Sequence, residues 1–173
     1  MIDTLCKLLD AGVTQFHVVK ECGDILQEHD YRELDMGERW ELMAGGRYYV
    51  KPYPSMLVAF AIGEVPEYGR LNIGLAHTDF PMLKIKTQPD MNRCGYQTLN
   101  VEPYGGLIKE TWFDRLLGIA GKVVVQTEDP FRPRTYLYDS ERAICIVPSL
   151  APHLRKEMTG DKMNVQKELI PVY

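Results

Sequence analysis

The stretch LNIGLAHTDFP, residues 71–81, joins a compact apolar run to a histidine and an aspartate. Asn72–Ala76 is short and mostly apolar, which predicts a strand buried on both faces. Pro81 has no amide proton to donate, so the strand is expected to end before it. Side chains alternate along an extended segment, so His77 and Asp79 should point the same way, roughly 6.5 Å apart along the chain. The end of a buried strand is where open α/β sheets bind their ligands.

An imidazole beside a carboxylate is typical of a metal site. A neutral histidine binds the metal, and the carboxylate holds the ring in place through a hydrogen bond. His77 is therefore a candidate metal ligand, and Asp79 is its candidate partner. A histidine and an aspartate that only cap a loop would give the same tripeptide, and the motif alone leaves that alternative open.

Length and composition limit the class of protein. A chain of 173 residues makes one ordinary domain or two small ones. Its hydrophobic share of 45% and charged share of 25% are typical of a folded globular protein. The net charge of −4, without a Lys/Arg run, gives no reason to expect a nucleic-acid partner. The first residues lack an apolar signal region, and no run approaches the ~20 residues of a membrane span. We therefore predict a cytoplasmic protein with no membrane partner.

The pattern of the chain changes near residue 83. Before it, two helices are expected, the second from Gln15 to about Glu28 with Thr14 as its cap, followed by the apolar strand Met56–Ile62. After it, apolar and polar residues alternate, as in residues 83–87 and 97–101, which is typical of antiparallel sheets with one exposed face. We expect a mixed α/β chain with a domain boundary near residue 83.

Several segments resemble the aspartyl aminopeptidase family of dinuclear zinc metallopeptidases, in the family's order and across nearly the whole chain. The matching segments are QFHVV (15–19), GGRYYV (45–50), LVAFAIG (57–63), GLAHTDFP (74–81), EPYGG (102–106), TWFDRLLGIAGKVVV (111–125), VPSLAPHL (147–154) and LIPVY (169–173). The TWFDR segment with the LxxAGxVVV pattern is specific, whereas HTD alone is weak.

The resemblance implies an architecture. Residues 1–83 would be the start of a zinc-bearing α/β catalytic domain, with Met56–Ile62 and Leu71–Ala76 as adjacent strands. Residues 84–173 would be most of a β-rich dimerisation domain inserted into it. Complete members continue past LIPVY, and that continuation carries the bridging Asp, a Glu-Glu pair, another acidic ligand and a last His.

The resemblance also implies roles for three residues. His77 matches a zinc-ligating histidine, and Asp79 matches the carboxylate that orients it. His153 matches a histidine that reaches a neighbouring subunit's active site, where it binds substrate and stabilises developing charge. A solvated helix histidine is the alternative for His153, and Asp114 with Arg115 is read as a structural pair. Phe80 stands where the family usually has Ser, which leaves the metal geometry and the substrate preference open.

The function implied is that of a zinc-dependent aminopeptidase that removes acidic residues, Asp or Glu, from the N-terminus of peptides. Complete members hold two zinc ions per active site, and this chain would supply one ligand. Catalytic zinc needs about three protein ligands, so we expect the chain to be inactive without a missing C-terminal half. An uncovered sheet edge and the dimerisation domain predict a homo-oligomer, at least a dimer.

Two other interpretations remain. The chain could be a non-catalytic oligomerisation module derived from such an enzyme. It could also be an unrelated small α+β binding protein, which would require the ordered matches to be accidental.

Overall fold

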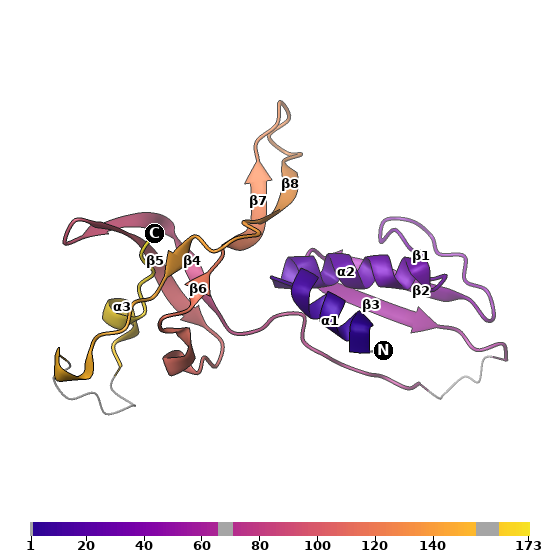
Figure 1. Ribbon diagram of the computed structural model, residues 1–173. Coiled ribbons are helices and arrows are strands. Elements are labelled where there is room, and N and C mark those ends of the chain that lie inside the picture. The colour runs from indigo at the N-terminus through magenta and orange to yellow at the C-terminus, as the bar shows by residue number, and fades with distance from the viewer. Residues whose placement is uncertain (1, 66–70, 155–162) are drawn as a thin grey trace. The chain divides into compact units, whose positions relative to one another are not determined.

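The computed structural model describes residues 2–65, 71–154 and 163–173 and has a mixed α/β fold, as predicted (Figure 1). The chain divides into two compact units, residues 1–80 with 121–137 and residues 81–120 with 138–173. The first break falls close to residue 83, but residues 121–137 are grouped with the first unit instead of the second. The assignment of residues 84–173 to a dimerisation domain stays a prediction. Among the described residues, no helix has the length and apolar character needed to cross a bilayer.

The first unit begins with the two expected helices, α1 (Ile2–Ala11) and α2 (Gln15–Glu28). Thr14 has an extended backbone, and its hydroxyl accepts a hydrogen bond from the backbone N–H of His17. This contact satisfies one of the amide groups that a helix N-terminus leaves without a partner. The predicted cap and both ends of the second helix are confirmed.

Helix α2 packs against a three-stranded sheet of β1 (Arg32–Glu33), β2 (Arg47–Tyr53) and β3 (Met56–Ala61) (Figure 1). The strand β1 pairs with β2 in parallel, and β2 pairs with β3 antiparallel. The ring of Trp40 stacks on that of Phe60 with centroids 6.2 Å apart, so the tryptophan covers the sheet.

Tyr49 of β2 is completely buried and joins the helix to the sheet. Its hydroxyl donates to a carboxylate oxygen of Glu33 at 2.8 Å and accepts from the side-chain amide of Gln27 on α2 at 2.7 Å. Burial, followed by the bond to Glu33, raises the pKa of Tyr49. The phenol therefore keeps its proton and remains a donor to the carboxylate.

The strand predicted for Asn72–Ala76 does not form among the described residues. Residues 71–77 pair with no described strand, so the predicted pairing with the strand at residues 56–62 is wrong. Leu71, Ile73 and Leu75 are 81%, 70% and 93% exposed. A strand buried on both faces needs neighbouring strands and covering layers, and the described part of the chain provides neither at this segment.

The second unit is built on the antiparallel hairpin of β4 (Met82–Arg93) and β5 (Tyr96–Tyr104) (Figure 1). Cys94 and Gly95 at its tip have positive φ angles of 51° and 85°, so the turn is tight. The other elements of this unit are short: η1 (Lys109–Trp112), β6 (Leu116–Leu117), β9 (Cys145–Ile146), η2 (Pro152–Leu154) and α3 (Val165–Glu168). The strands β7 (Ala120–Val125) and β8 (Arg134–Asp139) fall almost entirely in residues 121–137, which are grouped with the first unit. Strand β6 pairs with β9, and β7 pairs with β8.

Residues near Tyr173 connect the parts of the second unit. Val172 forms β-bridges to Thr98 of β5 and to Ile146 of β9. Leu169 and Val147 are both 0% exposed and pack in one cluster with Met163. Leu83 of β4 and Leu117 of β6 pack against this cluster, which therefore joins the hairpin to a short strand.

We expect Leu169→Ala to lower the free energy of unfolding of the second unit by about 2–5 kcal/mol, because it leaves a cavity in this core. Trp112 packs against the same cluster and can report its unfolding by fluorescence in a Trp40→Phe background. The matched control is Leu116→Ala, because Leu116 is 76% exposed, and it should cost less than about 0.5 kcal/mol. Equal urea midpoints for the two variants would show that Leu169 is not part of the core.

Candidate metal-ligating residues

His77 and Asp79 point toward one another, as predicted, although the chain bends at Thr78 between them and forms no strand there. Nδ1 of His77 lies 2.8 Å from Oδ1 of Asp79. The histidine side chain is 89% exposed and the aspartate side chain is 33% exposed. The pair is therefore open to solvent on the histidine side.

The hydroxyl of Thr78, between the two residues, fixes the backbone of the pair. It donates to the backbone carbonyl of Ser55 at 2.8 Å. Ser55 lies in the turn between β2 and β3, so this bond joins the His-Thr-Asp segment to the three-stranded sheet. The segment thus has an anchor although it is not a strand.

The contact between His77 and Asp79 determines which ring nitrogen is available. An ionised carboxylate only accepts hydrogen bonds, so Nδ1 of a neutral His77 must carry the hydrogen and donate it. The lone pair is then on Nε2, the nitrogen outside this hydrogen bond. A histidine held in this way by a carboxylate is the form in which imidazole binds zinc.

The described residues fit one zinc ligand with its orienting partner, and not a complete site. They contain no group of three or more His, Cys, Asp or Glu side chains that could hold a metal ion. A catalytic zinc is held by about three protein ligands. A zinc ion bound by His77 would therefore need further ligands.

His153 lies in the second unit, on η2, with its side chain exposed. The structure places it in a different unit from His77 and Asp79, so the three predicted site residues are not brought together within one unit. The exposed His153 side chain could act outside the core of the second unit, and a histidine that only contacts solvent would be equally exposed.

Asp114 anchors the segment that leads to His153, and the sequence interpretation did not find this role. Its Oδ1 accepts a hydrogen bond from the backbone N–H of Ser149 at 2.9 Å, and its own N–H donates to the carbonyl of Val147 at the same distance. Asp114 has a φ of 56°, a left-handed conformation that aspartate tolerates better than most residues. The partners lie more than 30 residues away along the chain, so no local pattern could have revealed them.

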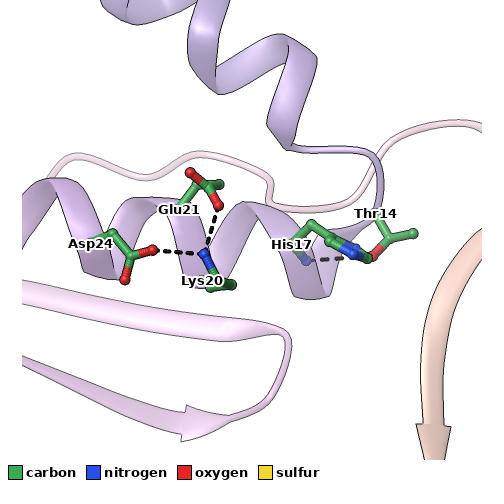
Figure 2. A network of polar contacts seen from close by, with 5 residues as sticks. All are labelled: Thr14, His17, Lys20, Glu21 and Asp24. Carbon is green, nitrogen blue, oxygen red and sulfur yellow. Dashed lines mark hydrogen bonds and ion pairs between the residues drawn. The ribbon is translucent and has the colours of Figure 1, made fainter. Parts of the chain in front are cut away.

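His17 lies in the first turn of α2 and contacts the residue that caps this helix. Its Nδ1 lies 2.7 Å from the Thr14 hydroxyl (Figure 2). One turn further on, the Lys20 ammonium contacts Asp24 at 2.8 Å and Glu21 at 2.9 Å, and these carboxylates raise the pKa of Lys20. The cluster in Figure 2 thus caps the helix and pairs charges along it.

Comparison with known proteins shows the family. The model of the aminopeptidase I zinc metalloprotease family, M18, matches residues 8–173. This chain therefore belongs to the M18 family of zinc metallopeptidases, as the resemblance implied.

The similar proteins are aminopeptidases of the same family. The chain is 40% identical over 171 residues to the probable M18 family aminopeptidase 2 of Stutzerimonas stutzeri, with 97% of this chain and 39% of the relative covered. It is 39% identical over 161 residues to the protein of the same name from Clostridium acetobutylicum, with 91% and 37% covered. The chain thus spans about two fifths of the length of the curated relatives it matches.

Solved structures agree with this relationship. A chain in the complex of Ape4 and Nbr1 superposes with a TM-score of 0.87 at 31% identity, over 99% of this chain and 33% of that one. The mApe1 structure from Chaetomium thermophilum gives a TM-score of 0.81 at 31% identity, over 98% and 39%. The mixed α/β fold is therefore that of one part of a larger M18 enzyme.

Proposed function

We propose that this chain is the N-terminal portion of a zinc-dependent aminopeptidase that removes acidic residues from the N-termini of peptides. The observation that carries the proposal is the His77–Asp79 pair, with its 2.8 Å contact, in a chain that matches a zinc metalloprotease family over residues 8–173. In this assignment His77 binds a zinc ion through Nε2, and Asp79 keeps the ring in the correct tautomer and orientation.

Bound zinc would polarise the peptide carbonyl and lower the pKa of a water molecule. In that chemistry, the residues of this chain would hold the zinc-binding imidazole in position. Thr78 ties the segment to Ser55, Asp79 holds the imidazole, and exposure leaves Nε2 of His77 accessible. A second zinc ion, a general base and the other ligands belong to the proposed remainder of the enzyme.

His153 is proposed to serve the active site of a neighbouring subunit. There it would bind substrate and stabilise the charge that develops on the attacked carbonyl. Its exposed position on η2 and the anchoring of the preceding segment by Asp114 support this role. The alternative function is a non-catalytic oligomerisation module, in which neither histidine takes part in chemistry.

The proposal is tested by expressing the chain alone and together with the remainder of the Stutzerimonas stutzeri relative. The chain alone should bind no stoichiometric zinc and show no aminopeptidase activity, because one imidazole cannot hold zinc tightly. The completed enzyme should contain zinc, by metal analysis, and cleave aspartyl p-nitroanilide faster than leucyl p-nitroanilide. A folded complex without zinc or activity would favour the oligomerisation module.

We also expect the chain to form a homo-oligomer, at least a dimer. The apolar side chains of Leu71, Ile73 and Leu75 are exposed, and exposed apolar side chains favour association. A structural neighbour with a TM-score of 0.72, the mApe1 of S. cerevisiae, is described as a dodecamer. Sedimentation velocity at high micromolar concentration tests this expectation, and a monomer there would contradict it.

A further inference from the structure

The second unit contains a cavity of about 450 Å³ between the end of the β4–β5 hairpin and α3. This volume lies within the range of about 300–1,000 Å³ that is usual for small-molecule sites. The lining residues that the structure describes all belong to the second unit. The cavity can therefore be assessed without reference to the first unit.

The floor and walls of the cavity are largely apolar. Ile170 and Thr98 are 8% and 3% exposed and form part of the floor. Tyr96, Leu150 and Leu154 also line the cavity, and they are 65%, 51% and 60% exposed. An apolar group that covers these exposed side chains removes apolar surface from water, which lowers the free energy of the complex.

Two cations line the same cavity. Arg93 ends β4, and its Nη2 donates to the backbone carbonyl of Gln166 at 3.3 Å, which places the guanidinium beside α3. Lys167 is the next residue of that helix and has an exposed side chain. Glu168, the one carboxylate among the described lining residues, accepts a hydrogen bond from the backbone N–H of Asn164 at 2.8 Å. The described part of the lining therefore has a net positive charge.

We propose that this cavity binds a carboxylate attached to a large apolar group. The apolar group would lie against Tyr96, Leu150 and Leu154, and the carboxylate would pair with Lys167 and Arg93. A carboxylate next to a large apolar group occurs at the C-terminus of a peptide whose last residue is large and apolar, and also in a free arylalkyl acid. The inference rests on the cavity and its charges and does not depend on the proposed peptidase activity.

The test is a titration of the ¹⁵N-labelled chain, followed by NMR, with N-acetyl-Gly-Gly-Phe and with 3-phenylpropionate. Saturable shifts should map to the amides of Tyr96, Thr98 and Lys167. Tighter binding of the peptide identifies a peptide C-terminus as the source, and tighter binding of the free acid identifies a small metabolite. The amide form, N-acetyl-Gly-Gly-Phe-NH₂, should bind about tenfold more weakly because it lacks the charge.

Lys167→Gln should weaken binding of the acid about tenfold and leave binding of the amide unchanged. Lys84→Gln is the matched control, because Lys84 is an exposed lysine on β4 that does not line the cavity. Added NaCl should weaken binding of the acid to the unmodified chain, which tests the charge without a substitution. No saturable shift up to about 5 mM, equal affinity for acid and amide, or shifts that map elsewhere would overturn the proposal.

Discussion

His77→Ala in the completed enzyme should remove most of the bound zinc and lower kcat/KM by more than about 100-fold. The expected loss exceeds the roughly 10- to 100-fold effect of a residue that only orients a ligand, because a metal-binding nitrogen itself is removed. The His77 side chain is 89% exposed, so its removal should not disturb the fold. Zinc content by metal analysis and turnover of aspartyl p-nitroanilide measure the two effects.

Two further variants make this result specific. His29→Ala removes another exposed histidine, at the C-cap of α2, and should leave zinc and turnover unchanged. Asp79→Asn keeps the shape of the partner but no longer requires Nδ1 of His77 to carry the hydrogen, so we expect a loss of about 10- to 100-fold with part of the zinc retained. Full zinc content and turnover in His77→Ala would show that the central assignment is wrong.

His153→Ala should lower kcat in the completed enzyme by about 10²–10³-fold with zinc content and folding unchanged. An exposed side chain on η2 contributes little to the core, so a loss of turnover would reflect catalysis. A drop in thermal stability, with turnover per folded molecule unchanged, would instead assign His153 a structural role.

Mixing subunits tests whether His153 acts on a neighbour. His153→Ala subunits have an intact metal site, and His77→Ala subunits have an intact His153. In a mixed oligomer the intact His153 of one subunit could serve the intact metal site of another, so part of the activity should return. Mixed oligomers confirmed by mass spectrometry that remain inactive would show that His153 acts within its own subunit or not at all.

Local sequence patterns predicted the parts of the fold that depend on short-range interactions. The cap at Thr14 and the limits of α2 follow from hydrogen bonds within four residues of one another. The contact between His77 and Asp79 joins residues two positions apart, across the bend at Thr78. In each case the physical cause lies inside the segment itself.

The prediction for Asn72–Ala76 was wrong because it depended on residues outside the segment. An apolar run favours burial, but a strand also needs partners for its backbone N–H and C=O groups. Residues 71–77 pair neither with β3, the edge strand of its sheet, nor with any other described strand, and Leu75 remains 93% exposed. Hydrophobicity alone therefore could not distinguish a buried strand from an uncovered extended segment.

The family, the mixed α/β class and the His77–Asp79 pair could be predicted from the sequence, because each depends on residues that are near neighbours or on an ordered set of matching segments. Three contacts became visible in the folded chain alone: Asp114 accepts a hydrogen bond from Ser149, Val172 joins β5 to β9, and Arg93 and Lys167 line one cavity. These contacts join residues from 26 to 74 positions apart. Their formation depends on how the whole chain packs, and a local pattern carries no information about that packing.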